Sequence, residues 1–166
     1  CIVIWGYNIP NTCPDNIFGH WFIDLMKRGV EIICIDPRLT WFSCRAKHWL
    51  RLRPGTDGAL AMGFLNTILS ENLYDREFVK KWTNAPFLVR KDTGKLLREK
   101  DIRADGLSEN FVVWDEGTQE PVVWESTKAS YGRESTRPSL TGSYTLDLAD
   151  GTKVECGTVW QAFCAE

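Results

Sequence analysis

Two carboxylates stand where two strand-like segments of this sequence stop. The β-branched run of residues 30–35 ends at Asp36, and the shorter apolar run of residues 49–53 ends in a Pro-Gly-Thr step that leads to Asp57. In an open α/β sheet, the carboxyl ends of parallel strands form the edge where nucleotides bind. The sequence therefore predicts a nucleotide site at this edge.

Asp36 stands where a carboxylate accepts hydrogen bonds from both hydroxyls of a ribose. Pro37 stiffens the chain after it, and the forked guanidinium of Arg38 suits a phosphate. The plain alternative is a surface ion pair between Asp36 and Arg38.

Asp57 follows Gly55 at the expected start of a helix, where a carboxylate has two alternative uses. As a helix cap it would accept hydrogen bonds from the first helix amides. As a base reader it would pair with the two adjacent donors on the Watson–Crick edge of guanine. One side chain does not easily serve both roles, although Thr56 could cap the helix instead.

The loop after residues 1–5 contains Gly6 and Asn8 but lacks the full Gly-x-Gly-x-x-Gly pattern, so an ordinary nicotinamide or flavin fingerprint is not met. Gly6 would still let a ligand approach the backbone, and Asn8 offers both a donor and an acceptor. The alternative is a plain strand-to-helix turn.

Other chemistries find little support. The sequence has no Gly-x-Ser-x-Gly, no Walker lysine and no His–Glu metal pair, and His20 and His48 are expected to be structural. Its six cysteines form no Cys-x-x-Cys pair, which makes a metal site improbable; most are expected to be reduced core residues. The net charge of −2 argues against binding to nucleic acid or to a membrane surface.

The elements around these residues are predicted as follows. Residues 1–5 form a buried strand, a helix opens at Pro14 and Asp15 and closes at Gly29, and residues 30–35 form the next strand, giving a βαβ unit. A long helix begins at Thr56 or Asp57 and ends near residue 72, and a shorter one spans residues 75–82 with an Asp cap.

After residue 85 the pattern changes to three hairpins, with turns at residues 92–94, 116–117 and 150–151, followed by the start of a helix at residues 158–165. The stretch 126–138 is polar and irregular. We therefore expect an α/β protein: a doubly wound, mostly parallel Rossmann-like sheet in residues 1–85 that binds the nucleotide, and an antiparallel hairpin-rich extension of the same domain in residues 86–166.

Together, the loop 6–8 (GYN), the step 35–38 (IDPR) and the segment 52–60 (LRPGTDGAL) resemble the molybdopterin oxidoreductases of the dimethyl sulfoxide reductase family. The tail is similar to members near acetylene hydratase, the transhydroxylases and the catechol dehydroxylases. The resemblance implies a domain of a large catalytic subunit, often of anaerobic respiration, that holds molybdenum or tungsten between two molybdopterin guanine dinucleotides.

Carried over residue by residue, the resemblance implies that the chain binds the guanosine diphosphate arm of this cofactor. Gly6 and Asn8 would line the phosphate and ribose side, Asp36 would hold the ribose with Arg38 near it, and Gly55 and Asp57 would contact the guanine. The sequence departs from the family at Ile9, where many members have Pro, and at Cys13, where some have His.

The resemblance also implies what lies elsewhere in a parent protein: the 4Fe-4S cluster, the protein ligand of the metal and, as a partner, an iron–sulfur electron-transfer subunit. Because the chain begins at Cys1 in mid-strand without a Met, we expect a fragment of a longer protein. The family's four-cysteine motif and the domain that supplies the metal ligand are missing from this sequence, so the resemblance implies a fragment without catalytic or metal-binding residues of its own. The resemblance leaves the compartment open between the cytoplasm and the periplasm of bacteria or archaea, the latter reached by a parent with a twin-arginine signal.

Two competing hypotheses belong to other classes. A stand-alone GTP- or GDP-binding module would need a phosphate-cradling lysine loop, which the sequence lacks. A structural or interaction domain without nucleotide contact is suggested by the eight tryptophans, several of which would pack against other parts of a parent.

Overall fold

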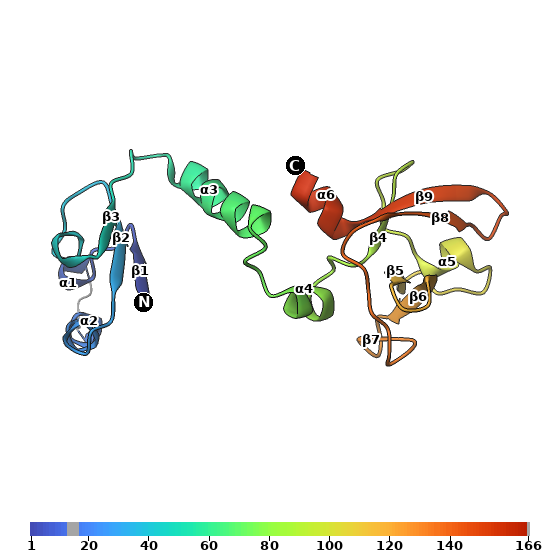
Figure 1. Cartoon of the computed structure of the whole chain (residues 1–166), viewed down its shortest axis with the longest axis horizontal. Helices are drawn as coiled ribbons and strands as arrows, with labels where there is room; N and C mark the ends of the chain where they lie inside the picture. Colours follow the sequence, from blue (N-terminus) through green and yellow to red (C-terminus); the bar gives the residue numbers. More distant parts are fainter. Residues whose placement is uncertain (13–16, 166) are drawn as a thin grey trace. The chain divides into compact units, whose positions relative to one another are not determined.

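A computed structural model describes residues 1–12 and 17–165 of the chain (Figure 1). By contacts the chain divides into two compact units, Cys1–Thr67 and Ile68–Glu166. The predicted boundary between a nucleotide-binding part, residues 1–85, and an extension, residues 86–166, stays a prediction. No helix among the described residues is both long and apolar enough to cross a bilayer.

The first unit contains a parallel sheet of three strands in the order β1-β2-β3: β1 (Ile2–Trp5), β2 (Ile32–Ile35) and β3 (His48–Leu50). β1 pairs with β2 in parallel, with Ile2 opposite Ile32, and β2 pairs with β3 in parallel, with Ile33 opposite His48. A parallel connection needs a crossover, and α2 (Ile17–Lys27) supplies it between β1 and β2.

Apolar side chains on one side of this sheet form a small core. Phe42, which is fully buried, packs edge-to-face on Phe22 of α2 with ring centroids 5.5 Å apart. The cluster comprises Ile4, Ile9, Ile32, Cys34 and Phe42. Gly29 ends the α2 region at φ 83°, as its predicted capping role requires. The predicted opening of this helix at Pro14 and Asp15, like Cys13, lies outside the described residues.

Two local predictions in this unit were incomplete. The segment 6–12, expected to be a turn, contains the single-turn helix α1 (Ile9–Thr12). The third strand, expected over residues 49–53, ends at Leu50, because Leu52 N–H turns back to donate to the Leu50 carbonyl at 3.1 Å and leaves the sheet. A 3₁₀ turn, η1 (Ser43–Arg45), lies between β2 and β3, and α3 (Asp57–Ser70) follows.

The second unit is built from antiparallel strands. The predicted hairpins with turns at residues 116–117 and 150–151 are confirmed as strand pairs, and the one with its turn at residues 92–94 is closed by an isolated bridge between Val89 and Leu96. One sheet has the order β4-β9-β8, from β4 (Leu88–Arg90), β8 (Ser143–Asp147) and β9 (Lys153–Thr158). The other has the order β5-β6-β7, from β5 (Phe111–Asp115), β6 (Glu120–Glu125) and β7 (Ser130–Tyr131), the last within a stretch expected to be irregular.

Short helices complete the second unit: α4 (Arg76–Trp82), α5 (Glu99–Ile102) and α6 (Val159–Ala165). Asp75 caps α4 as predicted, because its carboxylate accepts the Phe78 N–H at 3.0 Å. One of the buried clusters of this unit comprises Leu88, Leu97, Val112, Leu146, Val154 and Cys156. A parallel sheet followed by antiparallel hairpins confirms the predicted α/β class.

The cysteines depart from the expectation that most are core residues. All five described cysteines carry free thiols, but only Cys34 and Cys156 are buried. Burial raises the pKa of the Cys156 thiol to about 11, so this thiol stays protonated at neutral pH. The other three, Cys1, Cys44 and Cys164, are exposed.

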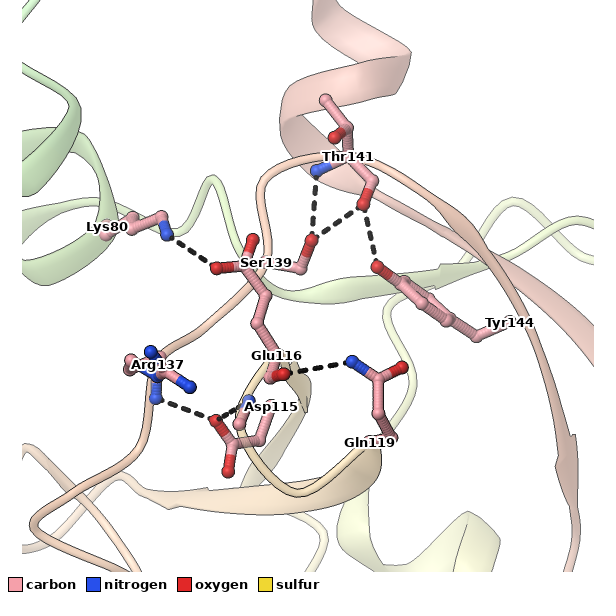
Figure 2. Close-up of polar contacts among 9 residues, drawn as sticks. Lys80, Asp115, Glu116, Gln119, Arg137, Ser139, Thr141 and Tyr144 are labelled. Carbon is pink, nitrogen blue, oxygen red and sulfur yellow. Dashed lines mark hydrogen bonds and ion pairs between the residues drawn. The ribbon is translucent and has the colours of Figure 1, made fainter.

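Asp115 organises the turn between β5 and β6 (Figure 2). Its carboxyl group, on a residue only 2% exposed, accepts the backbone N–H groups of Arg137 at 2.8 Å, Gly117 at 3.1 Å and Thr118 at 3.3 Å. The Thr118 hydroxyl donates a fourth hydrogen bond at 2.9 Å. Burial alone would raise the pKa of Asp115, but these hydrogen bonds outweigh it and hold the pKa below its usual value.

Asp115→Asn should therefore lower the free energy of unfolding by about 2–3 kcal/mol at pH 7, since it removes the charge that several buried donors require. A lowered pKa gives stability that is complete above the unfolded value of about 3.9 and is lost as the pH falls through the folded value. Urea unfolding should show the gap between wild type and variant constant above about pH 5 and shrinking below about pH 4.

The matched control is Asp147→Asn on β8, whose carboxylate is 75% exposed and 3.8 Å from Lys153 Nζ. This change should alter stability by less than about 0.5 kcal/mol. A gap for Asp115→Asn that is as large at pH 3 as at pH 7 would contradict the electrostatic explanation.

Candidate nucleotide-binding site

The three parallel strands of the first unit end at one edge, and the predicted site residues follow their ends. Gly6 comes directly after β1 and Asp36 directly after β2, while Gly55 and Asp57 follow the short segment that leaves β3. A hollow of about 290 Å³ lies at this edge, close to the lower end of the roughly 300–1,000 Å³ usual for small-molecule sites. Its lining is Gly6, Ile35, Asp36, Pro37, Arg38, Leu52, Pro54, Gly55 and Asp57.

Five of the six residues singled out from the sequence thus line one hollow: Gly6, Asp36, Arg38, Gly55 and Asp57. The sixth, Asn8, lies one residue before α1 and outside this lining. Its carbonyl oxygen Oδ1 is buried without a hydrogen-bond partner among the described residues. A buried acceptor left unpaired costs free energy, and a ligand donor would relieve that cost.

Both glycines of the hollow adopt a backbone conformation that other residues rarely take. Gly6 has φ 61° and Gly55 has φ 87°, and a side chain added at either would meet open space. Gly6 N–H donates to the Ile35 carbonyl at 2.8 Å, which holds the loop against β2. The left-handed conformation therefore requires glycine at these two turns, and the space beside them is open to a ligand.

Asp36 is buried, at 5% exposure, and its position is fixed by three hydrogen bonds. Its Oδ1 accepts the Arg38 N–H at 2.8 Å, its carbonyl accepts Trp49 Nε1–H at 2.9 Å, and its own N–H donates to Leu50 O at 3.3 Å. Among the described residues no donor reaches its second carboxylate oxygen. That oxygen is available to a hydroxyl of a ligand.

The chain after Asp36 is held in place by a buried polar cluster. Thr40 and Ser43 share a hydrogen bond of 2.8 Å, and Ser43 Oγ lies 3.1 Å from the Cys34 thiol of β2. The same hydroxyl donates to the Arg38 carbonyl at 3.3 Å. These contacts fix the backbone of Arg38 while its exposed guanidinium remains at the rim of the hollow. Asp36 and Arg38 are therefore joined through a backbone amide, and the ion pair considered as the alternative is not formed between these two described residues.

Asp57 is the first residue of α3 and is exposed. Its Oδ1 accepts the indole N–H of Trp5 at 2.6 Å, and among the described residues it accepts nothing from a helix amide. Thr56 does not replace it as a cap: among the described residues no helix amide donates to the Thr56 hydroxyl, which itself donates to the Arg53 carbonyl at 2.7 Å. The carboxylate therefore has acceptor capacity left for a ligand with two adjacent donors.

The contacts of Trp5 and Trp49 with the site were not found from the sequence. A general rule could have indicated these contacts, because a half-buried indole N–H needs a hydrogen-bond partner. Both tryptophans lie in strands whose carboxyl ends lead to the site residues.

Two other hollows are larger than the one at the sheet edge. One hollow of about 510 Å³ lies in the second unit beside Arg90, Lys95 and Lys100, and another of about 510 Å³ lies in the first unit between Tyr7 and Phe18. The first gathers mainly cationic side chains and the second mainly apolar ones. Of these three hollows, the smaller one at the sheet edge joins two carboxylates, a cation and two left-handed glycines. Among the described residues no group of three or more His, Cys, Asp or Glu could hold a metal ion.

Comparison with known proteins identifies relatives over nearly the whole chain. The family model described as molybdopterin oxidoreductase matches residues 1–153. The chain is 31% identical to the alpha chain of the perchlorate reductase of Dechloromonas aromatica (strain RCB), covering 96% of this chain and 20% of that protein. It is 36% identical to the dopamine dehydroxylase of Eggerthella lenta, covering 96% of this chain and 16% of that protein.

A third relative is a putative catalytic chain of dimethyl sulfoxide reductase from Halobacterium salinarum (strain ATCC 700922 / JCM 11081 / NRC-1). It is 32% identical over 94% of this chain and 17% of that protein. The chain thus spans about a fifth or less of the length of these relatives.

Replacing the glycines tests the backbone of the site without any ligand. Gly6→Ala and Gly55→Ala should each lower the free energy of unfolding by about 1–2 kcal/mol, because an L-residue is strained in the left-handed region even where space is open. Gly63→Ala, at an open position inside α3, should instead stabilise by up to about 1 kcal/mol. Urea unfolding of the three variants measures this contrast. A Gly55→Ala variant as stable as Gly63→Ala would show that the turn is not held in this conformation.

Proposed function

This chain belongs to the molybdopterin oxidoreductase family, and we propose that its first unit binds the guanosine diphosphate arm of a molybdopterin guanine dinucleotide. The hollow at the carboxyl edge of the parallel sheet supports this assignment most directly. It is the place where an α/β sheet binds nucleotides, and its side chains offer the acceptors that a nucleoside needs.

The charges of the hollow favour one orientation of the nucleotide. Carboxylates beside phosphates would repel them, so Asp36 and Asp57 belong with the nucleoside and Arg38 with the diphosphate. Asp36, with one free oxygen, accepts hydrogen bonds from the ribose hydroxyls. Asp57 accepts those of the guanine, since N1–H and the 2-amino group present two adjacent donors.

The two glycines allow the ligand to come close to the backbone. At Gly6 and Gly55 no side chain stands between the backbone and the hollow, so the nucleotide can come within hydrogen-bond distance of the main chain. Asn8, with its unpaired Oδ1, faces the phosphate and ribose side in this proposal. The hydrogen-bonding groups of this site therefore fit a guanosine diphosphate.

The reaction takes place outside this chain. When bound, the cofactor supplies a redox-active molybdenum or tungsten centre, while the residues described here bind and orient its nucleotide end. We propose a parent protein that is an oxidoreductase catalytic subunit, with a 4Fe-4S cluster and the remaining domains beyond this chain. Since relatives are named as alpha subunits of perchlorate reductase and dimethylsulfide dehydrogenase, an iron–sulfur electron-transfer subunit is the proposed partner.

Exposed apolar side chains favour a second role beside nucleotide binding. None of the residues of α3 is buried, and Met62 is 62% exposed; Trp82, at the end of α4, is 69% exposed. Surfaces of this kind mark contacts with other protein. We propose that the remaining domains of the parent cover them, so the chain serves both as a binding unit and as an interaction surface.

Calorimetry with GDP tests the assignment of Asp57. The chain should bind GDP weakly, in the millimolar range, because the parent's other domains supply the rest of the site. Asp57→Ala should weaken the binding of GDP by about tenfold or more, because two hydrogen bonds to a charged acceptor are lost. It should leave the affinity for ADP unchanged. Asp24→Ala on α2 is the control, because this exposed carboxylate lies on the helix and pairs with Lys27, at 3.6 Å.

Tight, micromolar GDP binding that Asp57→Ala leaves unchanged would refute the role given to Asp57. Equal affinity of the wild-type chain for GDP and ADP would refute the proposed recognition of guanine as a whole.

A further inference from the structure

A hydrogen bond joins two residues that lie 52 positions apart, at the end of β1 and the start of α3. Trp5 Nε1–H donates to Asp57 Oδ1 at 2.6 Å, and Asp57 is otherwise an exposed side chain. Exposed carboxylates sample several rotamers, and one at the start of a helix commonly folds back on its own first amides. Here the indole holds the carboxylate away from that local alternative.

The indole is itself held in place. Its ring meets Phe64 edge-to-face, with centroids 6.1 Å apart and planes at 87°. Phe64 lies seven residues after Asp57 on α3, two helical turns away, so both residues lie on one face of the helix. Trp5 therefore contacts this face twice, through its ring at Phe64 and through its N–H at Asp57.

We infer that Trp5 is a positioning residue for guanine: its indole N–H presets the Asp57 carboxylate in the orientation that accepts both guanine donors. This inference rests on the proposed function. One hydrogen bond to Oδ1 leaves one lone-pair site on that oxygen and two on Oδ2, which suffices for N1–H and the 2-amino group. A carboxylate already held in place loses less rotamer freedom when the base binds. This smaller entropy cost raises the affinity for guanine relative to bases with fewer donors.

Trp5→Phe removes the N–H donor and keeps an aromatic ring, although a smaller one, beside Phe64. Hypoxanthine is the matched base, since IDP differs from GDP by the absence of the 2-amino group alone. The wild-type chain should prefer GDP over IDP by about tenfold, and Trp5→Phe should reduce this preference severalfold, because GDP, which uses both donors, loses more affinity than IDP, which keeps only N1–H. Trp21→Phe on α2, at an indole that is 58% exposed, should leave the preference unchanged.

A double-mutant cycle shows whether Trp5 acts through Asp57. In an Asp57→Ala background the GDP-to-IDP preference should be close to one, and Trp5→Phe should change it no further. Heteronuclear NMR gives a readout without ligand: the Trp5 indole N–H resonance should shift and lose protection from exchange in Asp57→Ala, while that of Trp21 stays in place.

The outcomes distinguish the role of Trp5 from the recognition of guanine by the chain. If Asp57→Ala abolishes the GDP preference but Trp5→Phe retains it, or if the indole resonance does not respond to Asp57→Ala, the role of Trp5 is overturned and that of Asp57 stands. If the folded wild-type chain shows no preference for GDP over IDP or ADP, the proposed guanine recognition fails, and the inference about Trp5 fails with it.

Discussion

Parallel pairing of three short strands is the constraint on which the candidate site depends. Because β1, β2 and β3 run in one direction, the residues that follow them emerge at one edge, although they come from positions 6, 36 and 55–57 of the chain. The hydrogen bonds of Gly6 N–H to Ile35 and of Asp36 N–H to Leu50 extend this pairing one residue past the strands. A change of register between β2 and β3 would displace Asp36 relative to the segment that carries Asp57, and one between β1 and β2 would displace Gly6.

The two carboxylates proposed to bind the nucleoside are held by hydrogen bonds, whereas the cation proposed to bind the phosphates has an exposed side chain. Asp36 is buried and held by its neighbours, and the Thr40–Ser43–Cys34 cluster fixes the backbone behind it. Asp57 is exposed but held by Trp5. Arg38, in contrast, presents an exposed side chain on a fixed backbone, so its forked guanidinium is accessible for a bidentate contact with a diphosphate.

The sequence predicted those features that depend on local chemistry. Asp75 caps α4, Gly29 takes the left-handed conformation, and the Asp150-Gly151 turn joins β8 to β9, because each of these depends on a few adjacent residues. The grouping of Gly6, Asp36 and Asp57 at one edge followed from the expected parallel direction of the strands, while Gly55 was singled out through the family resemblance. The sequence did not show the Trp5–Asp57 hydrogen bond, the exposure of Cys44 or the early end of β3, since these depend on tertiary packing that periodicity does not report.

Mapping GDP onto the isotope-labelled chain by amide chemical shifts tests the central claim most directly. If GDP binds at the sheet edge, the amide resonances of Gly6, residues 36–38 and residues 55–57 will shift together as GDP is added, and those around Arg90, Lys95 and Lys100 will not. Shifts concentrated in that cationic hollow of the second unit, or shifts at the sheet edge that ADP reproduces fully, would contradict it.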